Sequence, residues 1–344
     1  MNTSGVTKNV VSIIIPIYNV RPFLREALDS VIYQSYRNIE ILLIDDGSND
    51  GSERICDEYK KKDERIRLIH QKNKGLSAAR NAGLNVATGH IIAFLDPDDA
   101  FHPDYIGKML ETMEQERADL VVCNFTICKD FSDFATRKEG ALPIKEGIYD
   151  RDNILRALAD DMIGHAVWNK LYRRELWEKI RFPVGHDYED LDTTFKVLSL
   201  CNSVCVIDEV LYFHRIRTGS ITNTFSQKTI TDRIRACSHF ESFVGSHTPA
   251  VFSEEQLSKV QCSDLGAMVT LYCRYVAEKN HPCDAFERRL RKKIIVTGAN
   301  IDIEKCNFKI RTAYLLICHC PYLLKIIYPA YHTIKQAVRT MTGR

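Results

Sequence analysis

The stretch of sequence that decides the fold is VVSIIIPIYN, residues 10–19 of a 344-residue chain. Its first part is apolar and largely β-branched without alternation, which predicts a strand buried on both faces. Two later stretches repeat this design, namely IEILLIDDGS at residues 39–48 and HIIAFLDPDD at residues 90–99. In each of these two, an apolar run ends in acidic residues. We therefore expect all three runs to be buried strands of one sheet.

Helical patterns separate these strands. Pro22–Gln34, for example, carries an apolar stripe at helical spacing behind an early proline. The predicted elements of this part are the strands Val10–Pro16, Ile39–Ile44, Ile66–His70 and His90–Leu95, and the helices Pro22–Gln34, Ser52–Lys61 and Leu76–Ala87. This alternation predicts a doubly wound α/β sheet. Ligands of such sheets bind beyond the carboxyl ends of the strands, where the acidic residues stand here.

The rest of the chain divides into an extension of the sheet and a helical region. The expected elements are the helix Tyr105–Arg117, the strand Asp119–Cys128, a variable loop up to Gly147, the helix Asp150–Ile163 and the closing strand Val204–His214. From Ser226 onward we expect the helices Ile230–Gly245, Glu254–Lys279 and Asp284–Thr297. The predicted domains are therefore an α/β domain over residues 1–225 and a helical C-terminal region over residues 226–344.

Composition excludes several classes of protein. Hydrophobic residues make up 45% of the chain and charged residues 27%, which is an ordinary globular balance. The net charge of +2 provides no general attraction to nucleic acid, so we expect no nucleic-acid partner. The N-terminal apolar run is too short for a signal peptide, which favours a cytoplasmic protein whose 12 cysteines are mostly buried free thiols. Cys318-His319-Cys320 lacks a second ligand pair, which argues against zinc.

The tightest acidic cluster is Asp96-Pro97-Asp98-Asp99, which follows a predicted buried strand. Carboxylates this close together repel one another unless a cation neutralises them. Oxygen ligands suit Mg²⁺ or Mn²⁺, and such ions usually bridge a carboxylate to substrate phosphates. A solvated acidic turn or a helix N-cap is the simpler interpretation of the cluster alone. Its position opposite a second acidic pair, Asp45-Asp46, favours the metal site.

Polar residues near Asp45-Asp46 complete this edge of the predicted sheet. A carboxylate there can accept a hydrogen bond from a base N–H or a ribose hydroxyl. Lys74 and Gly75 precede the next helix and Arg80 lies on it, as expected of an element that faces phosphates. Because Arg80 stands among alanine and leucine residues, we expect it to have a specific partner.

The order of these motifs resembles the successive signatures of family 2 glycosyltransferases with the GT-A fold. The similar segments are Ser12–Asn19, Leu43–Ser48, Asn73–Asn81 and Phe94–Asp99, and the resemblance extends over about residues 10–215. It implies a Rossmann-like, doubly wound mixed sheet with a helical C-terminal region. It also implies an inverting enzyme that moves a sugar from a nucleoside-diphosphate donor, which we expect to be a UDP-sugar, to a saccharide acceptor. The implied cofactor is Mn²⁺ or Mg²⁺.

The resemblance assigns a role to each donor-side motif. The residues expected to bind the nucleotide-sugar are Pro16, Tyr18, Asn19, Asp45, Asp46, Lys74, Gly75, Arg80, Asp96, Pro97, His214 and Arg215. Tyr18 would border the base, Asp45 would contact it, and Asp96 would hold the ribose. Asp98 would ligate the metal. Asp99 would be either an alternative ligand or a residue that positions the ligand without contacting the metal.

Later segments resemble the acceptor side of the same enzymes. They are Trp168–Tyr172 and Tyr188–Asp192. An inverting displacement needs a base on the acceptor hydroxyl and an electrophile on the leaving diphosphate. The resemblance implies that Asp190 is the base, with Glu189 as the alternative. An acidic pair at a helix N-terminus is the purely structural interpretation of both residues.

The segment Tyr212–Ile221 resembles the stretch that closes over the diphosphate in many relatives. In that case His214 and Arg215 would neutralise the leaving group. A basic loop of this kind is also often only a solvated surface, so both interpretations stay open.

Two other functions also stay open from the sequence. A nucleotidyltransferase shares the architecture and the acidic metal site, but it would carry a glycine-rich basic loop where this chain has Pro16–Asn19. A non-catalytic sugar-binding module on the same fold would be favoured by the loss of Asp98 or of the pair Glu189–Asp190. These residues are present, which favours the enzyme.

The expectations for the acceptor and for the membrane are linked. Relatives with similar segments often build capsule, exopolysaccharide or lipopolysaccharide on a lipid carrier, so the resemblance implies a lipid-linked saccharide acceptor. The last apolar segment, Tyr314–Val338, contains Pro321, Lys325 and Pro329 and makes a poor membrane-spanning helix. It fits either an interfacial helix on an anionic membrane or a helix docked on protein. The first alternative places the enzyme peripherally on the inner face of the plasma membrane.

Overall fold

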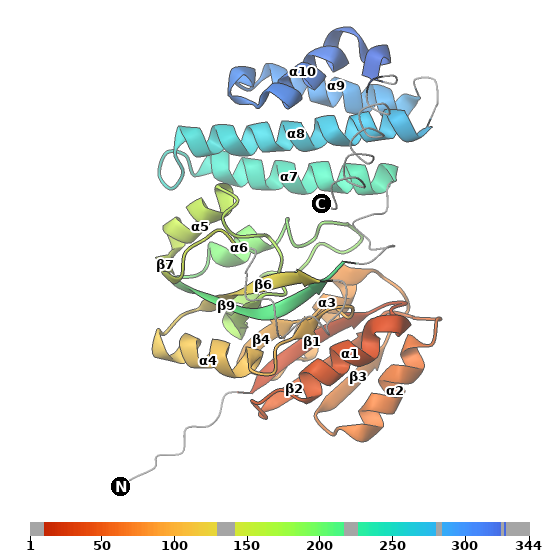
Figure 1. Cartoon of the computed structure of the whole chain (residues 1–344), viewed down its shortest axis with the longest axis vertical. Coiled ribbons are helices and arrows are strands. Elements are labelled where there is room, and N and C mark those ends of the chain that lie inside the picture. The colour runs from red at the N-terminus through yellow and green to blue at the C-terminus, as the bar shows by residue number, and fades with distance from the viewer. Residues whose placement is uncertain (1–9, 129–141, 217–225, 280–283, 325–326, 328–344) are drawn as a thin grey trace. The chain divides into compact units, whose positions relative to one another are not determined.

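The computed structural model describes residues 10–128, 142–216, 226–279, 284–324 and 327. The chain divides into two compact units, Met1–Thr224 and Phe225–Arg344 (Figure 1). The N-terminal unit contains a mixed sheet with helices on both faces, and the C-terminal unit is helical.

Nine strands of the described residues form one mixed sheet in the N-terminal unit. They are β1 (Val11–Ile17), β2 (Ile39–Asp45), β3 (Ile66–His70), β4 (Ile91–Phe94), β5 (Ala100–Phe101), β6 (Leu120–Cys128), β7 (Gly147–Asp150), β8 (Lys170–Arg173) and β9 (Ser203–Arg215). The order is β3-β2-β1-β4-β8-β6-β9-β5, and β7 pairs with β9. β3, β2, β1 and β4 are parallel, whereas β8 runs antiparallel to β4 and β6. The mixed α/β sheet that the sequence predicts is confirmed.

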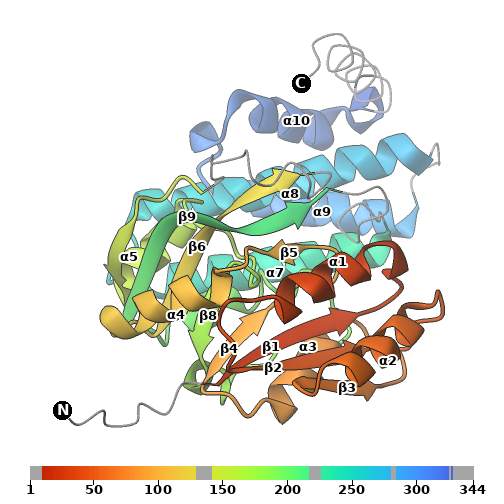
Figure 2. The ribbon, with the colours of Figure 1, turned by 60° about the horizontal axis from the view of Figure 1, so that its bottom comes forward.

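Helices cover both faces of the parallel strands (Figure 2). In this unit they are α1 (Arg21–Ile32), α2 (Ser52–Lys62), α3 (Leu76–Val86), α4 (Tyr105–Gln115), α5 (Arg151–Ala159), the 3-10 helix Arg174–Trp177 and α6 (Thr194–Leu198). Ile13 and Ile15 of β1 belong to a core that includes residues of α1, α2 and α4. Ile14 points to the other face, where a Cβ on Gly83 of α3 would lie 2.4 Å from its side chain. Burial on both faces explains why β1 is apolar almost throughout.

Positive φ angles end two helices earlier than the sequence pattern predicts. α4 ends at Gln115 rather than at Arg117, because Arg117 adopts a φ of 51°. α5 ends at Ala159 rather than at Ile163, because Asp161 adopts a φ of 59°. A residue in the left-handed region cannot continue a right-handed helix. The strands β5, β7 and β8 were not predicted, since elements of 2 and 4 residues carry too little pattern.

The C-terminal unit is helical, as predicted. Its elements are α7 (Gln227–Ser246), α8 (Glu254–Lys279), α9 (Ala285–Ala299), the 3-10 turn Ile303–Lys305 and α10 (Phe308–His319). α7, α9 and α10 begin at side-chain caps, because Ser226, Asp284 and Asn307 each accept a hydrogen bond from a backbone N–H of the first turn. These three helices pack on α8 around an apolar core.

Two of the predicted segments are only partly described. α10 covers the beginning of Tyr314–Val338, residues 321–324 add a helical turn, and most of the remainder lies outside the described residues. Of the variable loop before Gly147, residues 129–141 also lie outside them. Within the described ranges, no helix is long and apolar enough to cross a bilayer. The cysteines of these ranges are free thiols, and most of them are buried.

Candidate active site

The carboxyl ends of β1, β2 and β4 lie next to one another at one edge of the sheet. β2 and β4 flank β1 as parallel neighbours, and Ile17 at the end of β1 lies opposite Asp45 at the end of β2. The segments Tyr18–Asn19, Asp45–Asp46 and Asp96–Asp99 follow these strand ends, so they gather at the same edge. The structure thus brings the three predicted motifs together.

Asp45 is buried, and both of its carboxylate oxygens are engaged. Oδ1 accepts a hydrogen bond from the backbone N–H of Ser48 (3.0 Å), and Oδ2 lies 2.8 Å from Nδ1 of His70. The hydrogen bond with Asp45 raises the pKa of His70, whose other ring nitrogen lies 3.5 Å from Asp57. His70 was not among the site residues predicted from the sequence. The available signal was its position at the end of β3, directly opposite Asp45 in the sheet.

Asp46 fixes the loop before α3. It is 2% exposed, and its carboxylate accepts hydrogen bonds from the backbone N–H groups of Lys74 (2.9 Å) and Gly75 (2.7 Å) and from the side chain of Gln71 (2.6 Å). Gly47 adopts a φ of 78°, and a Cβ there would lie 2.9 Å from a backbone nitrogen of the same loop. Glycine is therefore required for this close approach. Lys74 and Gly75 contact Asp46 through their backbone N–H groups, and the side chain of Lys74 is exposed.

The end of β1 is tied to the end of β2 through Asn19. Asn19 adopts a φ of 51°, its backbone N–H donates to Ser48 Oγ (3.2 Å), and its side-chain oxygen accepts from the backbone N–H of Asn49 (2.9 Å). Pro16 is buried inside β1, whereas Tyr18 is 47% exposed. Tyr18 is therefore the member of this motif that offers an accessible side chain.

Arg80 of α3 joins the end of β4 to the predicted acceptor side. Its side chain is only 3% exposed, and Nη2 donates to Oδ1 of Asp96 at 2.7 Å. Nη1 forms a second ion pair, with Glu189. The guanidinium carbon also lies 5.4 Å from the centre of the Phe182 ring. A buried charge requires such partners. The specific partner that the sequence predicts for Arg80 is therefore a pair of carboxylates, those of Asp96 and Glu189.

Glu189 and Asp190 form an acidic pair beside this cation, in which Glu189 is buried and Asp190 is partly buried. Burial raises the pKa of Glu189 to about 7, although Arg80 acts in the opposite direction. Burial also raises the pKa of Asp190, again against Arg80. Oδ1 of Asp190 accepts from the backbone N–H of Leu191 (2.7 Å), and no other described residue donates to its carboxylate. Neither residue caps α6, whose N-cap is Thr193.

Asp99 is held by β9. It is 1% exposed, and its carboxylate accepts hydrogen bonds from the Tyr212 hydroxyl (2.7 Å) and the backbone N–H of Arg215 (2.8 Å). Nδ1 of His214 lies 3.2 Å from the same carboxylate. Burial raises the pKa of Asp99 to about 6, against the effect of His214. Because three donors already contact this buried carboxylate, these contacts favour Asp99 as a residue that positions the metal ligand over Asp99 as a ligand itself.

His214 stacks on Trp168, with ring centroids 5.4 Å apart and an interplanar angle of 3°. Burial lowers the pKa of His214, but the hydrogen bond with Asp99 and the charges of Asp96 and Asp98 raise it overall. The side chain is 40% exposed. A partly exposed imidazole is therefore available beside the acidic turn.

Arg215 faces α1 instead. Its side chain is 7% exposed and pairs with Glu26 of α1 through Nη2. Nε donates to the backbone carbonyl of Asp98 (3.0 Å), and the guanidinium carbon lies 5.2 Å from the centre of the Phe23 ring. The structure thus places Arg215 behind the acidic turn, and nothing in the sequence pattern of α1 marks Glu26 as its partner.

The accessible carboxylates of the acidic turn belong to Asp96 and Asp98. The Asp96 side chain is 25% exposed, Asp98 is partly exposed, and Pro97 between them is buried. Among the residues that the structure describes, no group of three or more His, Cys, Asp or Glu side chains forms a ready metal cage. These carboxylates still fit Mg²⁺ or Mn²⁺, because Mg²⁺ usually takes one or two carboxylates together with substrate phosphates and water.

A buried lysine fixes the segment Trp168–Tyr172. Nζ of Lys170 donates to a backbone or side-chain oxygen of Gly164 (3.2 Å), Ala166 (2.5 Å) and Asn169 (2.9 Å). Burial lowers the pKa of Lys170 to about 7. Trp168 stacks on Tyr212 at 4.3 Å between centroids. Lys170 therefore holds this segment in place from its buried side. Trp168 supports the site directly, because its ring stacks on Tyr212 and His214.

Comparison with known proteins gives the family. The model of glycosyl transferase family 2 matches residues 12–181. GlyA of Streptococcus pneumoniae serotype 4, a glycosyltransferase, is 37% identical over 223 residues, which are 63% of this chain and 32% of GlyA. GlyG of the same organism, also a glycosyltransferase, is 32% identical over 221 residues, which are 62% of this chain and 73% of GlyG. The chain belongs to glycosyl transferase family 2.

Solved structures agree with this family 2 glycosyltransferase in fold. Residues 1–349 of Staphylococcus aureus TarS, in complex with UDP-GlcNAc, match with a TM-score of 0.65 and 18% identity over 96% of this chain and 91% of that one. The mannosyltransferase PcManGT from Pyrobaculum calidifontis, in complex with GDP-Man and Mn²⁺, matches with a TM-score of 0.52 and 18% identity over 93% and 87%. The predicted GT-A fold is confirmed.

The relatives named above are glycosyltransferases, which favours a glycosyltransferase over the nucleotidyltransferase and the non-catalytic module. The chain spans 32% of the length of GlyA.

Proposed function

We propose that this family 2 glycosyltransferase transfers a sugar with inversion from a UDP-sugar to a saccharide acceptor, with Mn²⁺ or Mg²⁺ as cofactor. The observation that carries the proposal is the buried guanidinium of Arg80, which contacts Asp96 at the end of β4 and Glu189 beside Asp190. One cation thus holds the carboxylate proposed for the donor next to the pair proposed for the acceptor. An inverting displacement requires that donor and base meet in one site in this way.

On the donor side, Asp98 is the proposed metal ligand and Asp96 the proposed ribose ligand. When bound, the metal would neutralise charge on the donor diphosphate. Asp96 is 25% exposed while it pairs with Arg80, so its carboxylate can also accept a ribose hydroxyl. Asp99 is proposed to position this turn from behind, through its bonds to β9.

The nucleotide base is proposed to lie against Tyr18 and close to Asp45. Tyr18 is supported by its exposed ring. Each carboxylate oxygen has two lone pairs, so Asp45 can accept a base N–H while it keeps Ser48 and His70. Asp46 would act indirectly, by holding the loop that borders the nucleotide. The uridine identity is supported by the TarS complex with UDP-GlcNAc, whose fold this chain shares.

On the acceptor side, Asp190 is the proposed base and Glu189 the alternative. A pKa raised by burial suits a group that takes a proton near neutral pH. Glu189 is held by Arg80, whereas Asp190 has one oxygen to which no described residue donates. This difference favours Asp190 as the group that accepts the proton of the attacking hydroxyl.

The leaving diphosphate is proposed to meet His214. Its partly exposed ring and raised pKa support a cation at this position. Arg215 would contribute indirectly, by fixing the backbone of Asp98 through the carbonyl that its Nε contacts.

The acceptor is proposed to be lipid-linked, and the enzyme to work on the cytoplasmic face of the membrane in polysaccharide assembly. The end of the C-terminal unit exposes large apolar side chains, namely Phe308 (74%), Leu315 (50%), Tyr322 (72%) and Ile327 (48%). Such side chains on a terminal element suit shallow contact with a bilayer. In this proposal residues 1–225 are the catalytic domain and residues 226–344 the membrane-associated region.

A donor screen tests the proposal. The full chain is mixed with UDP-, GDP- and dTDP-sugars in the presence of Mn²⁺, Mg²⁺ or EDTA, and its melting temperature is measured. Binding to the native state should raise the melting temperature with a UDP-sugar and metal, but not in EDTA. Stabilisation by another nucleotide-sugar alone would contradict the UDP assignment, and equal stabilisation in EDTA would contradict the metal.

A further inference from the structure

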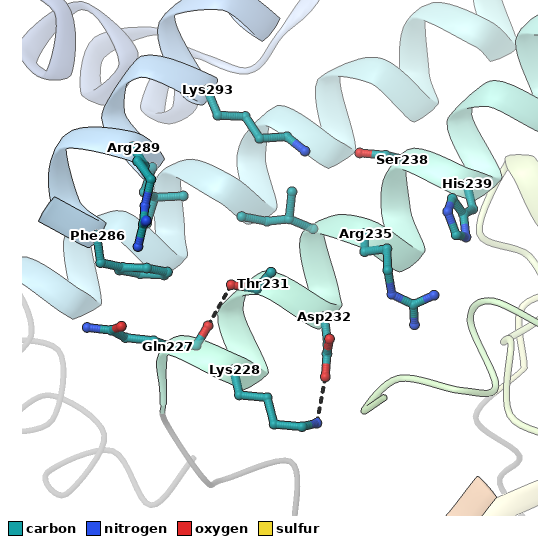
Figure 3. Close-up of a pocket in the computed structure, with 12 residues that line it drawn as sticks. Gln227, Lys228, Thr231, Asp232, Arg235, Ser238, His239, Phe286, Arg289 and Lys293 are labelled. Atoms are coloured by element: carbon teal, nitrogen blue, oxygen red, sulfur yellow. Dashed lines mark hydrogen bonds and ion pairs between the residues drawn. The ribbon is translucent and has the colours of Figure 1, made fainter. Parts of the chain in front are cut away.

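A groove of about 770 Å³ lies between α7 and α9 in the C-terminal unit (Figure 3). Both helices pack on α8. Its volume falls within the usual range of small-molecule sites. All of its lining residues belong to these two helices, and none belongs to the site described above.

The floor of the groove is apolar and fixed. Ile234 of α7 and Leu290 of α9 line it, are 6% and 5% exposed, and form part of the core of the unit. Phe286 of α9 extends the floor, with its ring 5.1 Å from that of Tyr275. These side chains cannot move away without disturbing the core, so they offer a preformed surface for hydrocarbon.

The walls are cationic. Lys228 and Arg235 come from α7, and Arg289 and Lys293 come from α9. The single carboxylate among the lining residues is Asp232, which pairs with Lys228 at 2.6 Å. Figure 3 shows Arg289 and Lys293 reaching from α9 toward α7. Within the described part of the chain, no carboxylate forms an ion pair with either of these two residues.

We infer that this groove binds a lipid phosphate. The hydrocarbon would lie on the floor at Ile234, Phe286 and Leu290, and the phosphate or diphosphate would meet Arg289 and Lys293. Guanidinium and ammonium groups are the usual partners of phosphate oxygens. A free phosphate would leave the floor unused, and a neutral lipid would leave the cations unused. The inference rests on the proposed function only for its biological purpose, which would be to hold the carrier of the acceptor sugar.

Binding of farnesyl diphosphate to the full chain tests the inference, measured by isothermal titration calorimetry in EDTA. EDTA removes any metal-dependent binding of the diphosphate at Asp98. The double variant Arg289→Gln/Lys293→Gln should weaken binding by at least about tenfold, because two charge-assisted contacts are lost. Both residues are exposed, so the variant should fold.

The matched control is Lys292→Gln/Lys309→Gln. It removes the same charge from two exposed lysines of the same unit that do not line the groove. Its Kd for farnesyl diphosphate should equal that of the wild type. Equal weakening in both double variants would show only general electrostatic attraction and would overturn the inference.

Two fragments of the ligand separate the sources of binding. Inorganic pyrophosphate and farnesol should each bind at least about tenfold more weakly than farnesyl diphosphate, because each uses one half of the groove. If pyrophosphate binds as tightly, the site is one for free phosphate. If farnesol binds as tightly as farnesyl diphosphate, the cations do not contribute to binding. Either result overturns a lipid-phosphate site.

The Asp98→Ala variant keeps this inference apart from the proposed function. It should retain binding of farnesyl diphosphate in EDTA and lose metal-dependent binding of the UDP-sugar. If the wild-type protein binds the UDP-sugar with metal but does not bind farnesyl diphosphate, the lipid-phosphate site is overturned and the proposed function is not. Asp98→Ala protein that keeps metal-dependent donor binding would overturn the metal assignment alone.

Discussion

Arg80 and Glu189 stand 109 residues apart in the sequence, yet their side chains form a buried ion pair. They are 3% and 10% exposed, and Asp96 lies on the same guanidinium at 2.7 Å. Removal of the cation would leave two carboxylates without their partner in a site of low dielectric constant. Arg80 therefore supports the fold of the site as well as the proposed chemistry.

Arg80→Met is expected to lower the free energy of unfolding by about 3–5 kcal/mol, the usual cost of breaking a buried ion pair from one side. Urea denaturation followed by circular dichroism measures it. The double variant Arg80→Met/Glu189→Gln should be less destabilised than the sum of its single variants, because the neutral amide that replaces the carboxylate no longer needs the cation. Strictly additive losses would show that the two residues do not stabilise each other.

Asp190→Asn is expected to lower kcat by about 10²- to 10⁴-fold, because the attacking hydroxyl loses its proton acceptor. The Kd for the donor should not change, since Asp190 is proposed to contact only the acceptor. Glu189→Gln is the matched variant and should retain more of kcat. Release of UDP measures turnover, and calorimetry measures donor binding. The reverse order of the two kcat values would move the role of base to Glu189.

The pH profile of kcat/KM should have an acidic limb. The proposed base acts only when deprotonated, and burial raises the pKa of Asp190 above its ordinary 3.8 and that of Glu189 to about 7. Activity should therefore fall as the pH is lowered through this range. In Glu189→Gln the limb should move to lower pH, because the negative charge of Glu189 no longer repels that of Asp190. A wild-type profile without an acidic limb would contradict a carboxylate base.

Asp98 and Asp99 should respond differently to replacement by alanine. Asp98→Ala should abolish metal-dependent donor binding with little change in stability, since its side chain is partly exposed. Asp99→Ala should lower the free energy of unfolding by about 1–3 kcal/mol, because buried donors on Tyr212 and Arg215 lose their acceptor. Calorimetry with Mn²⁺ and urea denaturation measure the two effects. If Asp98→Ala lowered the free energy of unfolding and Asp99→Ala did not, the roles assigned to the two residues would be exchanged.

The proposed membrane contact predicts that Leu315→Glu and Tyr322→Glu reduce co-sedimentation with vesicles that contain anionic lipid. Both residues are at least half exposed, so the charge disturbs the bilayer contact rather than the core. Val296→Glu is the control, because Val296 is 52% exposed on α9. Truncation within α10 is less informative, since it removes the core residue Ile317. Equal binding by all three variants would refute the contact.

The sequence by itself determined the class of fold and the position of the site along the chain. The apolar run of β1 and the helical stripe of α1 are local patterns, and local patterns are set by which face of an element is buried. Because parallel strands end at one edge, the polar residues after β1, β2 and β4 could be assigned to one site from their order along the chain. The family resemblance then supplied their roles.

Only the tertiary structure decided which of these polar groups remain available. Asp46 and Asp99 have the same chemistry as Asp98 in the sequence, yet Asp46 holds a loop and Asp99 holds β9. Arg80 looked like a phosphate ligand, and the structure pairs it with Asp96 and Glu189. The reason is physical: a buried charge or hydrogen-bonding group takes its partner from whatever segment the fold brings near, and that partner can stand 109 residues away.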